Sequence, residues 1–157
     1  MGGLREEDAV QETLRRLDET LRLYYPRLAA IGEDASVERP AGMKWSRKEI
    51  LGHLVDSASN NHQRFVRSQL STEIAFPPYD QEGWISMQRY DERPWGEIVL
   101  LWRSYNLHLF HVMSRVPAGK LGHLCVVRED EPTTLGDHIT DYVEHLVHHL
   151  DQILRES

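Results

Sequence analysis

Hydrophobic residues recur along this chain at intervals of three and four, which is the spacing of amphipathic α-helices. Four long stripes of this kind predict four helices. The first covers 10–31, the second begins at Ser46, the third begins at Pro94, and the fourth begins near Thr134 and continues to the C-terminal end. Pro26 lies inside the first stripe and predicts a kink or an early end of that helix.

Local signals support these boundaries. Ser46 and Glu49 have the spacing of a capping box at the start of the second helix. The connections over 32–45 and 71–93 contain proline and glycine, and the second has room for a short helix around 84–90. The apolar residues 124–127 favour an extended segment but are too few to predict a sheet.

Four helices in 157 residues predict an all-α fold, a four-helix bundle formed by one domain over 1–157. The two longer connections have room for crossovers. The pattern alone therefore does not fix an up-down-up-down order of the helices.

Composition excludes several classes of partner. The chain carries 25 acidic against 18 basic residues, a formal charge of −7, and no run of Lys or Arg that would bind a nucleic-acid backbone. No segment approaches the roughly 18 consecutive apolar residues of a membrane span, and the first ten residues lack the apolar core of a secretory signal. The single cysteine, Cys125, suits a reducing compartment. We expect a cytoplasmic protein with a small-molecule partner.

The nine histidines are the most distinctive feature of the composition. His145 and His149 lie four residues apart on the predicted fourth helix, so they are separated by about 40° around its axis and about 6 Å along it. Two imidazoles at this spacing can turn toward one ion. Both border the apolar stripe of that helix, which predicts that they face the interior.

A third candidate ligand, His53, lies between Leu51 and Leu54 on the buried stripe of the second helix. If the second and fourth helices run antiparallel, His53 meets the height of His145 and His149. Three histidines leave a coordination position open for water or substrate, as in catalytic zinc sites. The alternative is that these are neutral histidines packed in the core without a metal.

The remaining histidines are weaker candidates. His148 is expected at the rim of the site, and His138 lies about 10 Å along the helix from His145, too far to share its ion. His62 is on the opposite side of the second helix from His53 and is expected to be solvated. The others form no ligand pair: His108, His111 and His123.

Carboxylates precede two of the candidate ligands by one turn: Asp141 before His145, and Glu49 before His53. Either can accept the second ring N–H of its histidine and fix the imidazole tautomer. For Glu49 the capping box already gives a sufficient explanation. Asp141 is also the best candidate for a general base.

Three further features have weaker implications. Asn60 is expected to line the pocket, and Cys125 is a weak nucleophile candidate because it lies in a loop without a fixed partner. The tryptophans are expected to pack in the core and loops: Trp45, Trp84, Trp95 and Trp102.

Four short motifs resemble signatures of the DinB-like (DinB/YfiT) superfamily of metal-binding bundles. The resemblance covers about residues 10 to 155, and the order and spacing of the motifs are more specific than any one of them. The motifs are Trp45-Ser46-x-x-Glu49-x-x-x-His53-Leu54-x-Asp56, Trp84-x-x-x-Gln88-x-Tyr90, Trp102-x-x-x-Asn106 and Tyr142-x-x-His145-x-x-x-His149-x-x-Gln152-Ile153.

The resemblance implies a bundle with a long crossover between the second and third helices, and a site for nickel or zinc on His53, His145 and His149. Members of the superfamily include transferases and isomerases that use a low-molecular-weight thiol: bacillithiol, mycothiol or glutathione. The leading hypothesis is therefore a metal-dependent enzyme that transfers a thiol to a small electrophile, with metal-assisted hydrolysis second. The alternative is a non-catalytic metal-binding stress-response bundle, or an interaction protein that pairs as a homodimer through exposed faces.

Overall fold

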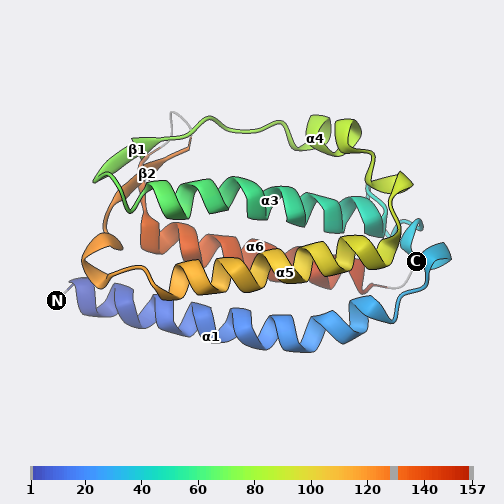
Figure 1. Cartoon of the computed structure of the whole chain (residues 1–157), viewed down its shortest axis with the longest axis horizontal. Helices are drawn as coiled ribbons and strands as arrows, with labels where there is room; N and C mark the ends of the chain where they lie inside the picture. Colours follow the sequence, from blue (N-terminus) through green and yellow to red (C-terminus); the bar gives the residue numbers. More distant parts are fainter. Residues whose placement is uncertain (1, 128–130, 156–157) are drawn as a thin grey trace.

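Four long helices form the body of the protein (Figure 1). The structure is a computed structural model that describes residues 2–127 and 131–155. The long helices confirm the predicted all-α bundle: α1 (Gly2–Ala29), α3 (Arg47–Arg67), α5 (Trp95–Ser114) and α6 (Leu135–Ile153). The shorter elements are α2 (Glu33–Ser36), α4 (Gln81–Gln88) and two 3-10 turns, η1 (Tyr90–Glu92) and η2 (Ala118–Lys120).

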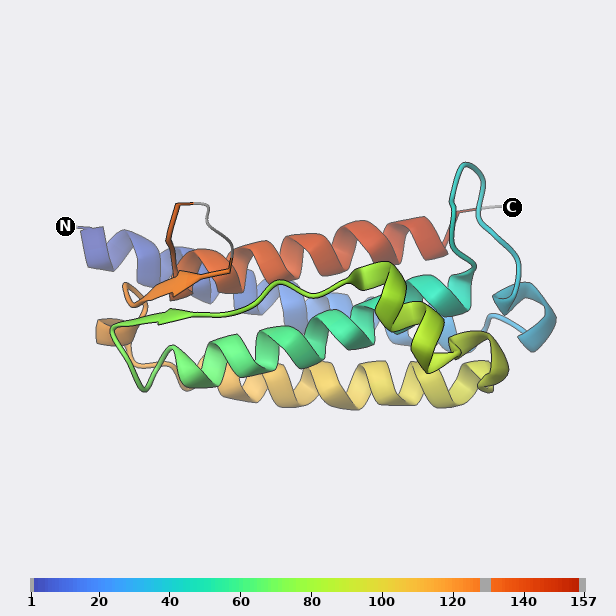
Figure 2. The same cartoon turned by 90° about the horizontal axis from the view of Figure 1, so that it is seen from above.

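The helices do not alternate in direction along the chain. α1 and α6 run one way, and α3 and α5 run the other way (Figures 1 and 2). Between α3 and α5 the chain therefore returns along the whole bundle before the next helix begins, which is a long crossover. α3 packs against both α5 and α6. Because α3 and α6 are antiparallel neighbours, the condition for bringing His53 to His145 is met.

Both helices that carry the candidate ligands begin at a capping box. At the start of α3, Ser46 Oγ accepts from the Glu49 backbone N–H, and Glu49 Oε2 accepts from the Ser46 backbone N–H at 2.7 Å. Thr134 and Asp137 form the same arrangement at the start of α6. Pro26 lies in the last turn of α1, which ends at Ala29.

A small three-stranded sheet closes one end of the bundle. β1 (Glu73–Ala75) pairs in parallel with β2 (Leu124–Val126), and β2 pairs antiparallel with β3 (Thr133–Thr134). The extended segment predicted near 124–127 is present, but the sheet was not predicted from the sequence. Its other strands are only two and three residues long, and β1 lies some fifty residues earlier in the chain.

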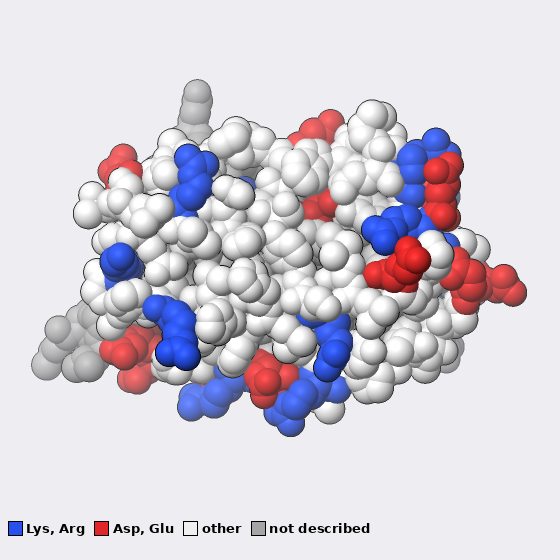
Figure 3. All heavy atoms as spheres, viewed as in Figure 1, with Lys and Arg blue, Asp and Glu red and all other residues white. Residues whose placement is uncertain are grey.

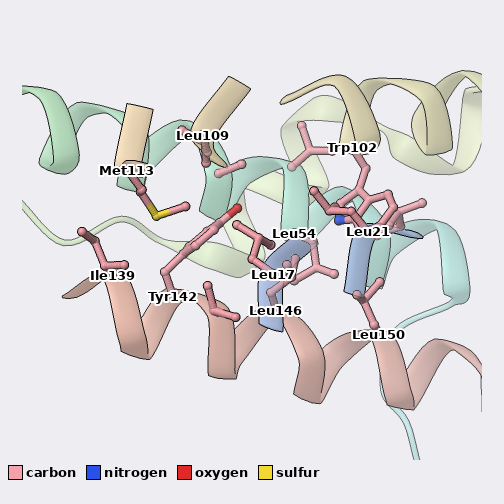
Figure 4. Close-up of a cluster of buried hydrophobic side chains, with 14 of the residues drawn as sticks. Leu17, Leu21, Leu54, Trp102, Leu109, Met113, Ile139, Tyr142, Leu146 and Leu150 are labelled. Carbon is pink, nitrogen blue, oxygen red and sulfur yellow. The ribbon is translucent and has the colours of Figure 1, made fainter. Parts of the chain in front are cut away.

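The core lies between the four helices (Figure 4). Its apolar residues fix which helix faces turn inward and so place the histidines. Leu54 of α3 and Leu146 of α6 are wholly buried, so the preceding residues, His53 and His145, lie at the boundary of the core. Tyr142 of α6 is also buried and donates to Asn106 Oδ1 of α5 at 2.5 Å. This hydrogen bond ties α6 to α5 next to the candidate ligands.

The crossover is fastened to α3. The Tyr90 ring packs directly on Gly52, where an added Cβ would lie 2.3 Å from the ring. The Tyr90 hydroxyl and the Gln88 amide both donate to Asp56 Oδ1 at 2.7 Å. These contacts hold α4 and η1 against α3, near the end at which that helix begins (Figure 2).

The surface is mixed in charge on the face shown in Figure 3. Basic and acidic side chains lie around the edge of this face, and its centre is largely uncharged. None of the helices in the described part of the chain combines the length and the apolar character that a bilayer crossing requires.

Candidate metal centre

His53 is fixed by its position in α3. Its side chain is 1% exposed, and its ring lies 5.2 Å from the Trp45 ring, centroid to centroid. Trp45 directly precedes the capping residue of α3, so the chain entering the helix covers the imidazole. Trp45 is thus a packing residue, as predicted, although its neighbour is a candidate ligand.

His145 and His149 occupy successive turns of α6, and both are half-buried. Their ring centroids lie 4.5 Å apart, and the His149 centroid lies 4.9 Å from that of His53. The two rings of α6 therefore turn toward α3, as the helical spacing predicts.

The three imidazoles converge on one point. One ring nitrogen from each of His53, His145 and His149 lies within 4.8 Å of the other two, and the Nε2 atoms of His53 and His145 are 3.2 Å apart. Two nitrogens bound to one tetrahedral zinc ion at about 2.0–2.1 Å are about 3.3 Å apart. The donor set and its spacing therefore fit a divalent metal ion.

Burial keeps these imidazoles neutral. It is the main cause of a pKa of about 3 for His53 and about 4 for His145, and the neighbouring histidines lower both values further. The pKa of His149 is lowered for the same reason, although its hydrogen bond to Gln152 opposes the shift. A metal binds the neutral imidazole, so all three side chains are in the binding form near pH 7.

Gln152 orients His149. The Nδ1–H of His149 donates to Gln152 Oε1 at 2.7 Å, which leaves the His149 Nε2 lone pair available to an ion. The Gln152 amide nitrogen in turn donates to His148 Nε2 at 3.0 Å, which places His148 at the rim as predicted. Sequence reasoning named Gln152 only as part of a motif and did not assign this role.

Neither predicted carboxylate partner contacts its histidine in the described part of the chain. The Glu49 carboxylate accepts the Ser46 backbone N–H in the capping box instead. Asp141 is exposed and makes no hydrogen bond to His145, although both residues line one cavity. Partial burial is the main cause of a raised pKa at Asp141. His53 Nδ1 is buried without a hydrogen-bond partner among the described residues.

Three further expectations need correction. His62 is half-buried rather than solvated, because its Nδ1 pairs with the Tyr105 hydroxyl of α5 at 2.9 Å. Asn60 donates to the Asp56 carbonyl, and its neighbour Asn61 lines the cavity instead. Cys125 is buried in β2, and burial raises the pKa of its thiol, which makes it a poor nucleophile.

The other histidines lie outside the three-histidine group. His138 hydrogen-bonds the Cys125 backbone, and its Nε2 is buried without a partner among the described residues. The His108 ring packs on His62, and His123 pairs with the Ser68 carbonyl. His111 is exposed.

Comparisons with solved structures support the fold. YfiT from Bacillus subtilis, described as a probable metal-dependent hydrolase with an unusual four-helix bundle topology, aligns with a TM-score of 0.80 and 20% identity over 92% of this chain and 83% of that one. A mycothiol-dependent maleylpyruvate isomerase aligns with a TM-score of 0.78 and 11% identity over 94% of this chain. The alignment spans 62% of the isomerase, so a substantial part of that enzyme has no counterpart here.

Sequence comparison gives the family. No curated protein matches the chain. The family model of the DinB superfamily matches residues 16–153, which include all three histidines of the cluster and both helices that carry them. This chain is therefore a member of the DinB superfamily.

Proposed function

We propose that this protein is a divalent-metal-dependent enzyme, with zinc or nickel held by His53, His145 and His149. The observation that carries the proposal is the convergence of three neutral imidazoles from α3 and α6 on one point. A cavity opens beside His145, so a small molecule can reach one side of the cluster. Three protein ligands with an accessible side are the arrangement of catalytic rather than structural zinc sites.

The preferred reaction is transfer of a low-molecular-weight thiol to a small electrophile. A divalent ion bound at the cluster would supply Lewis acidity that lowers the pKa of a thiol or of water. The chain itself keeps the imidazoles neutral, orients His149 through Gln152 and confines the reactants in the cavity. The sulfur–carbon bond forms as the leaving group departs with its bonding electrons, and the thiol proton passes to Asp141, which lies at the cavity with a raised pKa.

Two structural relatives favour different chemistries within this proposal. Similarity to a mycothiol-dependent isomerase supports the use of a thiol, whereas similarity to a probable hydrolase supports water as the nucleophile. We place thiol transfer first and metal-assisted hydrolysis second. A non-catalytic metal-binding bundle is the rival from another class.

The test begins with metal analysis of protein purified without an affinity tag, followed by assays with bacillithiol, mycothiol and glutathione against a panel of small electrophiles. We expect about one ion per chain, and a thiol adduct whose formation stops on chelation and resumes when metal is restored. A parallel assay without thiol detects hydrolysis. Full stoichiometric metal with no turnover in either assay, together with a large loss of thermal stability on chelation, would instead establish a structural metal.

Removing the side chain of Gln152 is expected to weaken metal binding without abolishing it. Gln152→Ala leaves the Nδ1–H of His149 without its acceptor, and loss of such a partner typically lowers metal affinity about 10- to 100-fold. Gln152→Glu retains an acceptor and is expected to bind at least as tightly as the wild type. Competition with a chromophoric chelator measures both variants, and equal affinities for Gln152→Ala and the wild type would contradict the assigned role.

A further inference from the structure

The cavity beside the three-histidine cluster extends along the groove between α3 and α6. Its volume is about 250 Å³. Residues spaced by three or four positions line it from both helices, so one face of each helix is turned to the cavity, and the crossover contributes the outer wall. The lining includes Ser57, Asn61 and Arg64 from α3, His138 and His145 from α6, and Tyr79 from the crossover.

Arg64 is a half-buried cation in this cavity, and no residue in the described ranges 2–127 and 131–155 gives it a carboxylate partner. Among the described residues, no Asp or Glu oxygen lies within 4.0 Å of its guanidinium, and its side-chain contact is Nη1 to Asn61 Oδ1 at 3.4 Å. Asp141 lines the same cavity but is exposed and forms no ion pair with Arg64. Burying a cation in this way has a free-energy cost that a bound anion would offset.

Apart from Asp141, the described residues around Arg64 in the cavity add hydrogen-bond donors rather than negative charge. Burial raises the pKa of Tyr79 to about 12, so its hydroxyl stays protonated and able to donate. Asn61 donates its amide to Ser57 and presents its oxygen to Arg64, which orients the guanidinium. The cavity therefore joins a fixed cation at one end to the histidine cluster at the other.

The spacing of the two ends sets the size of the ligand. Arg64 lies eleven residues after His53, about 16 Å along the helix axis. Both side chains lean toward the N-terminal end of the helix, and the longer Arg64 side chain leans further, so the guanidinium lies somewhat closer to the cluster than this axial separation. A short aliphatic chain covers this distance once the contacts at both ends are included.

We propose that Arg64 binds a carboxylate of the small molecule whose reacting group lies at the three-histidine cluster. The flat guanidinium offers two parallel N–H donors that match the two oxygens of a carboxylate. A phosphate dianion fits this cavity less well. The single positive charge of Arg64 would not neutralise its two negative charges, and the Asp141 carboxylate lies nearby. The position of the reacting group rests on the proposed function, whereas carboxylate binding at Arg64 does not.

The first arm of the test uses chelated protein and so does not depend on the metal. Mercaptobutyrate and its neutral amide are titrated while the side-chain Nε–Hε NMR signal of Arg64, identified by its loss in Arg64→Gln, is followed. We expect the carboxylate alone to shift this signal with saturation. No shift, or equal shifts from the acid and the amide, would overturn the proposal even if the protein is a metalloenzyme.

The second arm uses zinc-loaded protein and calorimetry with mercaptopropionate, mercaptobutyrate and mercaptohexanoate, each beside its amide. We expect the best-fitting acid to bind about 10- to 100-fold more tightly than its amide. Arg64→Gln should remove that preference and keep the affinity for the amides. Arg67→Gln removes the same charge from an exposed position of α3 and should keep the preference. A preference that survives in Arg64→Gln would refute the assignment to this residue.

Inorganic phosphate distinguishes the class of anion. In both arms it should bind more weakly than the carboxylates, and tighter binding would overturn the choice of carboxylate.

Absence of zinc binding in the wild type would reject the proposed function alone, because the metal-free arm would still decide whether Arg64 binds a carboxylate.

Discussion

His145→Ala is expected to purify without stoichiometric metal, whereas the wild type carries about one ion per chain. His145 Nε2 lies 3.2 Å from His53 Nε2 and its ring packs on His149, so it contacts both of the other candidate ligands. Without it, only two imidazoles remain, and two ligands hold a divalent ion weakly. Metal analysis of dialysed protein measures the loss, and circular dichroism should show nearly unchanged helical content.

His111→Ala provides the control. It removes an imidazole from an exposed position of α5, outside the three-histidine group and away from Gln152. Stoichiometric metal should be retained in this variant. Turnover, once an activity is found, should disappear in His145→Ala and persist in His111→Ala. If His145→Ala kept one ion per chain at wild-type affinity, the proposed ligand set would be wrong.

The helices, and the inward-facing positions of the candidate ligands on them, follow from short-range patterns. An apolar stripe identifies the buried face of each helix, and a histidine at the edge of that stripe must point toward a neighbouring helix. His53 and His145 are such residues, since Leu54 and Leu146 beside them are fully buried. The sequence did not establish which helices are neighbours or their directions, and the convergence of His53 with His145 depended on both.

The sequence analysis considers only carboxylates that precede the candidate ligands, whereas the residue that orients a ligand in the structure follows it. A helical side chain leans toward the N-terminal end of its helix. Asp141 therefore leans away from His145 and toward His138, whose imidazole partly offsets the rise that burial causes in the Asp141 pKa. Gln152, three residues after His149, leans back onto it and accepts its Nδ1–H. The direction in which the side chain leans, rather than the residue spacing alone, therefore determines whether Asp141 or Gln152 can reach a ligand histidine.

The other differences between the prediction and the structure depend on contacts between residues that lie far apart in the sequence. His62 is half-buried because Tyr105 of α5 lies beside it, and no local pattern identifies that partner. The β1–β2 pair joins Ile74 to Cys125 across some fifty residues. Segments of two or three residues have too little hydrophobic patterning to predict such a pairing.

Without metal, the protein is expected to lose stability steeply as the pH falls from 7 to 5. In the unfolded chain, His53 and His145 titrate near the ordinary histidine pKa of about 6.5. In the folded protein their pKa values are about 3 and about 4 because both rings are buried beside other histidines. At pH values between the folded and the unfolded pKa values, the unfolded state binds protons that the folded state does not bind. Acid therefore favours unfolding.

Each histidine contributes up to about 1.4 kcal/mol per pH unit in this window, so the pair contributes about 2–3 kcal/mol per pH unit below about pH 6. The contribution to stability is present above the unfolded pKa and is lost as the pH falls. Raised pKa values at Asp56 and Asp141 act in the opposite direction at lower pH, so the measurement stays above pH 5. Urea unfolding of chelated protein at several pH values gives the slope.

The double variant His53→Gln, His145→Gln separates this effect from general acid sensitivity. It removes both titrating rings while retaining polar side chains of similar length, so its free energy of unfolding should vary much less between pH 7 and pH 5. His111→Ala removes an exposed histidine and should retain the wild-type slope. Equal slopes in the wild type and the double variant would show that the buried cluster is not held neutral. The same result would remove the reason for expecting the cluster to bind an ion readily at neutral pH, because protonated imidazoles cannot act as ligands.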